Sequence, residues 1–320
     1  MRIIVKKRFL ALGMAALLTV TGICGVDTAK YAKADDTEQV FEFERETEIL
    51  KAGSKYKFTV SGADEEVRWS VSDKKYAIVS QNGILTGKRV GKVTLTAICG
   101  TNKISCKVKI EGKKKVAIDA GHQSVGDSST EPVGPGSSTR KAKVAGGACG
   151  VATGVPEYKF TLSMAKKLRK QLIDRGYAVY MIRDKNDVNI SNKERAVNAN
   201  KSGSDIYIRL HGDSIGSSSV TGASALYPSK NNRYVGKLSS KSYKLSKKVL
   251  GSYCKKTGIR NRGCVVRDDL TGTNWSKIPV TLIEMGFMSN SSEDRKMQKR
   301  DFQITMAEGL ADGIDAYFGY

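Results

Sequence analysis

The chain contains two histidines, His122 and His211, and each directly follows a short apolar run that predicts a β-strand. Imidazole serves both as a zinc ligand and as a general base near neutral pH. In an open α/β sheet, ligands bind beyond the carboxyl ends of the strands, which is where two such histidines can meet. No local spacing motif links the two, so taken alone they are better explained as unrelated surface or core residues.

Two glutamates favour a site over chance. Glu157 follows Pro156 and opens a predicted helix, where the helix dipole and the free N–H groups stabilise a carboxylate, although an ordinary helix-start glutamate has the same pattern. Glu284 ends the apolar run Val280–Ile283, and a partly buried carboxylate is costly there without a partner. Two histidines and one carboxylate with an open fourth position form a catalytic zinc site, and a second carboxylate outside the ligand set is the usual general base.

The elements that must position these residues alternate between strand and helix. Apolar runs predict strands, and patterns of period 3.6 predict helices; the strands are 116–119, 178–182, 206–210 and 280–283, and the helices are 158–175, 191–201, 238–256 and 302–318. Ser191 and Glu194 form a capping box for the second helix. This alternation predicts one α/β open-sheet domain over residues 113–320, with helices on both faces of the sheet.

Residues 35–112 have a different pattern. Short alternating strands are separated by turn signals, no helical period is visible, and Trp69 is a predicted core residue, so this region is expected to be a small all-β sandwich. The segments Val67–Asp73, Ala77–Gly87 and Gly91–Ala97 resemble a bacterial Ig-like group 2 domain. That resemblance implies a spacer or an adhesion module of a surface protein.

Five blocks, in order along residues 114–318, carry a second resemblance: Val116–His122, Glu157 at a helix start, Arg195–Asn200, Tyr207–His211 and Leu282–Asn290. Together they resemble the zinc-dependent N-acetylmuramoyl-L-alanine amidases of the bacterial cell wall. The resemblance implies that His122, Glu157 and His211 bind Zn²⁺ and that Glu284 is the catalytic acid/base. It also implies hydrolysis of the amide that joins N-acetylmuramic acid to L-alanine in peptidoglycan.

The sequence departs from that family in three places. Gln123–Ser124 stands where the family has two glycines, and Gly212–Asp213 stands where it has Ala-Asn. The interval before Glu157 is long, and Gly126–Gly154 is rich in Gly, Ser and Thr. This segment is either a substrate-facing insertion or a sign that Glu157 is not the ligand. Glu131 is the other glutamate in the interval, but its flexible context favours Glu157.

Two further features have alternative interpretations. Arg195, Asn198 and Asn200 lie on one predicted helix, where a structural network is favoured over substrate contact. Trp275 precedes the strand of Glu284 in a predicted loop. Its indole either stacks on substrate sugar or packs in the core.

Residues 1–34 are expected to be a signal peptide. A basic start precedes the apolar run Phe9–Val26, and Ala32–Ala34 offers a cleavage site of the A-x-A type. An uncleaved anchor is the alternative, and the residues before Cys24 make a poor lipobox. The mature chain is therefore expected to be secreted, in the bacterial cell wall or outside the cell, with no transmembrane segment. Its five remaining cysteines are odd in number and are left unassigned.

The formal net charge of the chain is +22. Residues 113–320 carry 35 basic and 19 acidic residues, a net charge of +16, whereas residues 35–112 are nearly neutral. Such an excess favours polyanionic partners. The signal peptide and the lack of a nucleic-acid-binding motif disfavour nucleic acid, so peptidoglycan with anionic wall polymers is the expected partner, and a merely solvated basic surface is the alternative. Another zinc peptidase of stem peptides, or a non-catalytic wall-binding or adhesion protein, remains a rival function.

Overall fold

The computed structural model of the chain describes residues 40–112 and 114–320. The predicted signal peptide, with its cleavage site and Cys24, lies outside these residues. Within them, we find no helix whose length and apolar content would let it cross a bilayer.

Residues 40–111 form a small all-β unit, as predicted. Its strands are β1 (Glu42–Arg45), β2 (Ile49–Lys51), β3 (Lys55–Lys57), β4 (Thr59–Ser61), β5 (Arg68–Val71), β6 (Ala77–Val79), β7 (Ile84–Gly87), β8 (Gly91–Cys99) and β9 (Asn102–Glu111). They pair into a four-stranded sheet β2-β9-β8-β5, a three-stranded sheet β3-β7-β6 and the pair β1-β4. The sheets enclose a core that includes Phe58, Leu85 and Leu95, and Trp69 packs against it partly buried.

The second region is built on a six-stranded sheet. Its strands are β10 (Lys115–Ala120), β13 (Ala178–Met181), β14 (Ile206–Asp213), β15 (Ala223–Tyr227), β16 (Asn261–Val266) and β17 (Val280–Phe287), in the order β13-β10-β14-β17-β15-β16. Strands β13, β10, β14 and β17 are parallel neighbours, whereas β15 runs antiparallel to β17. The four parallel strands therefore bring their carboxyl ends to one edge of the sheet.

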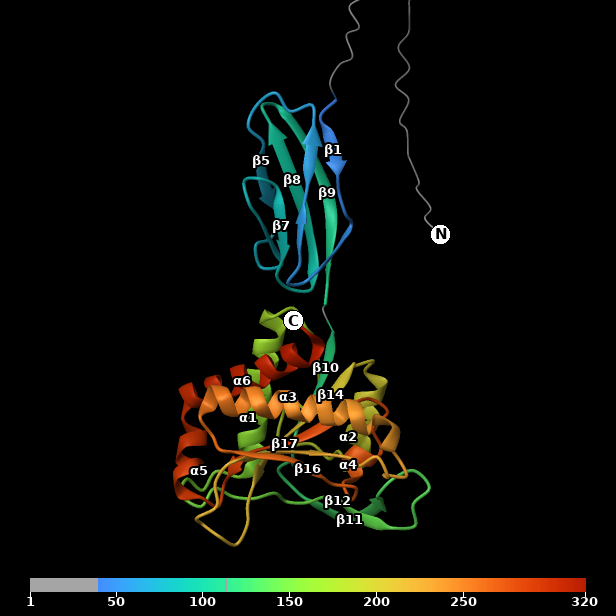
Figure 1. Ribbon diagram of the computed structural model, residues 1–320, viewed down its shortest axis with the longest axis vertical. Helices are drawn as coiled ribbons and strands as arrows, with labels where there is room; N and C mark the ends of the chain where they lie inside the picture. Colours follow the sequence, from blue (N-terminus) through green and yellow to red (C-terminus); the bar gives the residue numbers. More distant parts are fainter. Residues whose placement is uncertain (1–39, 113) are drawn as a thin grey trace, which may run out of the picture. The chain divides into compact units, whose positions relative to one another are not determined.

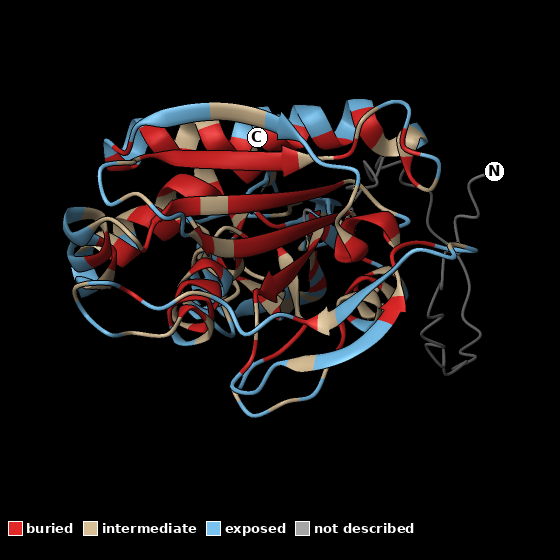
Figure 2. Cartoon of the chain, turned by 90° about the horizontal axis from the view of Figure 1, so that it is seen from below, coloured by how far each residue is buried: buried red, intermediate tan, exposed pale blue. Residues whose placement is uncertain are grey.

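Helices cover both faces of this sheet, and the predicted fold class is confirmed (Figure 1). The helices are α1 (Glu157–Asp174), α2 (Asn192–Lys201), α3 (Ser239–Thr257), α4 (Thr271–Asn274), α5 (Ser291–Gln298), α6 (Arg300–Phe318) and the short 3₁₀ turn η1 (Gly236–Leu238). Apolar residues of α1, α3 and α6 pack on the face that carries Ile118, Ile208 and Ile283. Alanines of α2 pack on the other face against Ala117 and Tyr207, because successive strand residues point to opposite sides. The central strands are buried almost throughout (Figure 2).

The glycine-rich interval before Glu157 is more ordered than its composition indicated. It contains an antiparallel hairpin, β11 (Asp127–Pro132) and β12 (Arg140–Val144). Three contacts fasten the hairpin to α2 and α4. Glu131 accepts a hydrogen bond from the amide of Lys193, the Asn192 side chain donates to the carbonyl of Lys143, and the Trp275 indole donates to the carbonyl of Pro132.

Candidate metal centre

The carboxyl edge of the sheet brings three of the four predicted site residues together. His122 lies two residues after β10, and His211 lies near the end of β14. Glu284, on β17, stands opposite His211 in the parallel register, and Ser224 of β15 lies on its other side. Glu157, the first residue of α1, is the fourth.

The backbone at His122 is unusual. Its φ is +59°, and among the described residues His122 is the one non-glycine with a positive φ. This conformation is sparsely populated by L-residues and persists where the surroundings enforce it. The preceding amide, of Gly121, donates to the carbonyl of Leu210, so the two histidine-bearing segments are tied together immediately before the turn.

Side-chain atoms of His122, Glu157 and His211 converge on one point. His122 Nε2 lies 3.2 Å from Glu157 Oε1, and His211 Nδ1 lies 3.1 Å from each of these two atoms. Such a compact triangle of two imidazole nitrogens and a carboxylate oxygen can hold one metal ion. The structure therefore brings the three predicted ligands together. The alternative ligand, Glu131 of β11, instead accepts a hydrogen bond at the N-terminus of α2, from the amide of Lys193.

Glu157 is held rigidly. Its Oε2 accepts a hydrogen bond from the amide of Ala148, and its Oε1 accepts one from the amide of Gly212. Burial acts to raise the pKa of Glu157, but the contacts of its carboxylate with the imidazoles of His122 and His211 outweigh it and hold that pKa below the ordinary value. The carboxylate is thus ionised and aimed at the centre of the triangle.

Hydrogen bonding decides which nitrogen of His122 faces the centre. His122 Nδ1 lies 2.8 Å from the carbonyl oxygen of Ala145, so Nδ1 carries the proton and Nε2 keeps its lone pair. In His211 the Nδ1 atom faces the centre, and Nε2 is buried without a partner among the described residues. Burial lowers the pKa of His211 to about 4, which leaves the ring neutral at pH 7, as a metal ligand must be.

Glu284 differs from Glu157 in its surroundings. Its Oε2 is buried and has no hydrogen-bond partner among the described residues. Burial raises the pKa of Glu284 well above the ordinary value, and the negative charges of Glu157 and Asp213 add to the effect. A carboxylate whose pKa is raised in this way is a stronger base than an ordinary one, which suits an acid/base.

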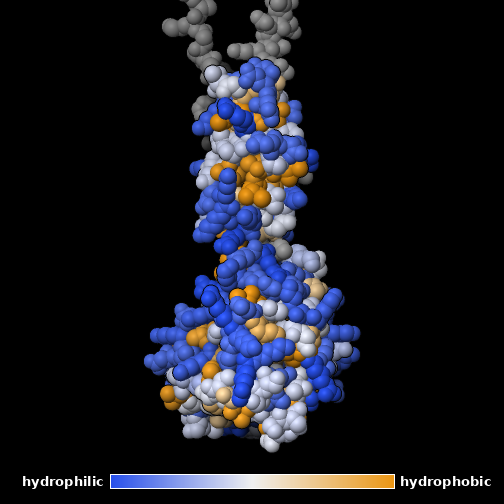
Figure 3. All heavy atoms as spheres, turned by 90° about the vertical axis from the view of Figure 1, so that its left-hand side faces the viewer, coloured by the Kyte–Doolittle hydropathy of each residue, from blue (hydrophilic) through white to orange (hydrophobic). Residues whose placement is uncertain are grey.

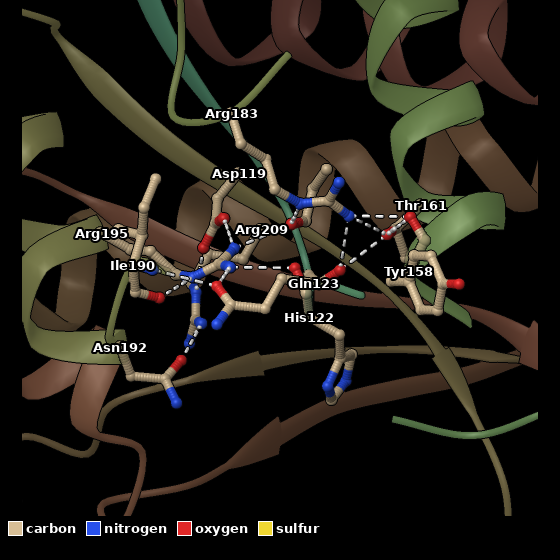
Figure 4. Close-up of polar contacts among 12 residues, drawn as sticks. Asp119, His122, Gln123, Tyr158, Thr161, Arg183, Ile190, Asn192, Arg195 and Arg209 are labelled. Atoms are coloured by element: carbon tan, nitrogen blue, oxygen red, sulfur yellow. Dashed lines mark hydrogen bonds and ion pairs between the residues drawn. The ribbon is translucent and has the colours of Figure 1, made fainter. Parts of the chain in front are cut away.

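A buried ionic network lies beside the turn that carries His122 (Figure 4). Asp119 accepts from Arg195 at 2.7 Å, from Arg209 at 3.0 Å and from the hydroxyl of Tyr207 at 2.9 Å. Burial acts to raise the pKa of Asp119, but the guanidinium groups of Arg195 and Arg209 lower it by more. The pKa of Asp119 therefore lies below its ordinary value, and the carboxylate stays charged. Arg195 thus has the structural role that was predicted for it, with Asp119 as its partner.

The same network supports the turn at His122 (Figure 4). Arg195 donates to the carbonyls of Ala120 and His122 and to the side chain of Gln123, and Arg183 donates to the carbonyls of Ala120 and Gly121. The contribution of Arg183 had no sequence signal, because it lies in an irregular segment after β13.

Two departures from the family pattern have a structural explanation. Gln123 is buried, and its side chain accepts from Arg195 and from the amide of Ile190, so it ties the turn to the start of α2. At Gly212, an added Cβ would lie 2.8 Å from the sulfur of Met288, so the local packing favours glycine there.

Gly121 is the basis of one prediction. A Cβ at this position would lie 2.4 Å from Cε1 of His211, so Gly121→Ala must displace that ring. We expect metal affinity to fall about 10- to 100-fold, the usual cost of misorienting a ligand. Titration with a chelator measures this. The matched control is Gly216→Ala, because Gly216 has open space around its Cα; equal affinities of the two variants would contradict the prediction.

Comparison with known proteins agrees with this geometry. Residues 116–316, well over half of the chain, match N-acetylmuramoyl-L-alanine amidase. The chain belongs to this amidase family. Residues 40–108 match the bacterial Ig-like domain (group 2). Both resemblances inferred from the sequence are therefore confirmed.

Individual relatives of the amidase domain are distant. N-acetylmuramoyl-L-alanine amidase LytC of Bacillus subtilis is 24% identical over 301 residues, which cover 90% of this chain and 54% of LytC. The chain thus spans about half the length of that curated relative. The amidase Ami1 of Mycobacterium abscessus is 25% identical with a TM-score of 0.59, over 64% of this chain and 99% of Ami1. The catalytic domain of CwlV from Paenibacillus polymyxa is 26% identical with a TM-score of 0.52, over 64% of this chain and 98% of that domain.

The structure also bears on the expectations for Asn200, Trp275 and the cysteines. Asn200 binds the loop of Trp275 and Lys277 through its side-chain amide, a structural role, as favoured. The Trp275 ring is partly buried next to α2, and its contact with sugar stays a prediction. The five cysteines that the structure describes are all free thiols, so no disulfide forms among them.

Proposed function

We propose that this chain is a secreted peptidoglycan hydrolase that cleaves the amide between N-acetylmuramic acid and L-alanine. The observation that carries the proposal is the triangle of His122, Glu157 and His211, with Glu284 in register beside His211. We assign the first three as zinc ligands and Glu284 as the catalytic acid/base. The proposed domains are a signal peptide over 1–34, an Ig-like domain over 35–112 and the amidase domain over 113–320.

Zinc is the metal that suits this donor set. Zinc in proteins prefers tetrahedral nitrogen and oxygen ligands at about 2.0–2.1 Å, which places ligand atoms roughly 3.3 Å apart. The three donor atoms here lie 3.1–3.2 Å apart. Zinc bound in this position supplies an activated water and polarises the carbonyl of the scissile amide.

The chain's own residues perform the remaining steps. His122, Glu157 and His211 would hold the ion. Glu284 takes a proton from the attacking water through its carboxylate, and it then delivers that proton to the leaving nitrogen of L-alanine. The raised pKa of Glu284 suits the first of these steps, because a carboxylate with a raised pKa accepts a proton from water more readily. The protonated Glu284 can then donate that proton to the leaving nitrogen.

Digestion of purified peptidoglycan tests the proposal. We expect mass spectrometry of the products to show intact stem peptides with a free L-alanine amino group and glycan with free lactyl carboxyl groups. Release of single amino acids would instead indicate a peptidase of the stem. Binding without any release, by metal-loaded protein, would indicate a wall-binding protein.

The basic charge of the amidase domain leads to a second prediction. Hydrophilic residues dominate the face of this region shown in Figure 3, with smaller apolar areas between them. We expect binding to isolated cell walls to weaken as salt rises and after removal of anionic wall polymers, because exposed charges are screened beyond about 8 Å at physiological ionic strength. A co-sedimentation assay measures both effects; binding that ignores both treatments would exclude the electrostatic explanation.

A further inference from the structure

A pocket opens directly beside the candidate metal centre. It has a volume of about 330 Å³, and its lining includes both histidines, the apolar side chains of Val144, Leu270 and Leu282, and the charged side chains of Lys141, Arg209 and Asp269. This volume is at the lower end of small-molecule sites, roughly 300–1,000 Å³. Because both histidines line it, whatever occupies the pocket lies next to the reacting atoms.

The β11–β12 hairpin forms one wall of this pocket. Lys141, Ala142 and Val144 of β12 all line it. The hairpin is fixed in place by the contacts of Glu131 and Trp275 with neighbouring segments, so its side chains are held in position before substrate arrives. This preorganisation is what a specificity-determining wall requires.

Asp269, at the rim of the pocket, contacts two cations. Arg267 donates two hydrogen bonds to the Asp269 carboxylate, at 2.7 and 2.9 Å, a bidentate pair that by itself neutralises that carboxylate. Lys141 also reaches Asp269, donating to its carbonyl oxygen and to Oδ2, both at 2.7 Å. An ammonium group has three N–H donors, so Lys141 keeps one donor for a further partner.

The neighbouring carboxylate, Asp268, keeps its charge but does not line the pocket. The oxygens of Asp268 accept hydrogen bonds from the amide and hydroxyl of Ser229 and from the side chain of Asn232. Arg209, the other cation of the lining, is already paired with Asp119 and Asn192. Lys141 is therefore the group at the rim that is prepared to receive an anion.

We propose that this pocket binds the stem-peptide side of the substrate, and that Lys141 selects peptides with a free carboxylate close to the scissile amide. The inference rests on the proposed function and adds the substrate's charge to it. The apolar walls suit the methyl group of alanine, and the carboxylate of the following residue would reach the ammonium of Lys141. A phosphate of a wall polymer carries the same charge, but it does not adjoin the bond that the site cleaves.

Two synthetic substrates test the proposal. Both are muramoyl tripeptides with an amidated C-terminus, in which a glutamate at the second position is joined to the third residue through its side-chain carboxyl group. They differ only in whether the α-carboxyl group of that glutamate is free or amidated. We expect the zinc-loaded full chain to cleave the free-carboxyl substrate with a kcat/KM higher on the order of tenfold, as for one hydrogen bond to a charged group. In Lys141→Gln the preference should disappear, and in Lys141→Glu it should reverse.

Lys143→Gln is the matched control, because Lys143 lies on the same strand, does not line the pocket and faces Asp127 at 3.8 Å. It should keep the wild-type preference. Equal cleavage of the two substrates by the wild type, or a preference that survives in Lys141→Glu, would overturn the inference while leaving the amidase activity in place. Cleavage of neither substrate, with peptidoglycan also intact, would instead count against the proposed function itself.

Discussion

Glu284→Gln should abolish most hydrolysis while leaving metal binding intact. The amide keeps the shape of the carboxyl group and can still hydrogen-bond, but it cannot accept a proton from water. We expect peptidoglycan hydrolysis to fall on the order of 10²–10⁴-fold, the usual contribution of a positioned acid/base. The measurement is the rate of release of stem peptide, together with the zinc content of the purified variant.

The control for this variant is Glu308→Gln, since Glu308 lies on α6 in a surface ion pair with Lys256. It should retain wild-type activity. Near wild-type hydrolysis by Glu284→Gln would refute the assigned role. Loss of zinc from Glu284→Gln, with retention in Glu157→Gln, would mean that the two glutamates have exchanged roles.

The pH dependence of kcat/KM is a second test of the acid/base role of Glu284. Burial and neighbouring carboxylates raise the pKa of Glu284, so the basic form that accepts the proton exists only above that raised pKa. As pH falls, kcat/KM should therefore begin to fall well above pH 4.5, the ordinary value for glutamate. An acid limb at or below the ordinary value would show that another group sets it.

Loss of any one metal ligand should remove both metal and activity. His122→Ala, His211→Ala and Glu157→Gln each leave two protein ligands, which cannot compete with chelator for zinc. Glu157→Gln also replaces an ionised oxygen by an amide that no longer balances the charge of the ion. We expect zinc content, measured after dialysis against a weak chelator, to fall far below one ion per chain in all three variants.

The same variants separate metal loss from unfolding. Circular dichroism should show a wild-type fold, because the sheet and its helix layers do not depend on these side chains. Full zinc occupancy in His122→Ala or His211→Ala would disprove the ligand assignment. Added zinc at high concentration should restore part of the activity of Glu157→Gln, since its carbonyl oxygen is still a weak ligand.

Much of the fold could be predicted because it follows from local pattern. The strands around Ile118, Ile208 and Ile283 are continuous apolar runs, as buried parallel strands require. The helix that begins at Glu157 shows its period plainly, and the capping box of Ser191 and Glu194 is present as predicted. The hairpin β11–β12 was missed, since its exposed strands are polar and its order comes from contacts with α2 and α4.

The residue types of the site and their order at strand and helix ends follow from local sequence pattern, because the carboxyl edge of a parallel sheet collects whatever follows its strands. How these residues meet depends on tertiary contacts. The in-register pairing of Glu284 with His211 and the carbonyl of Ala145 that orients His122 are contacts between segments distant in the chain. So is the placement of Lys141 beside the histidines. Such contacts depend on how the sheet twists and how the inserted hairpin packs, which no local pattern encodes.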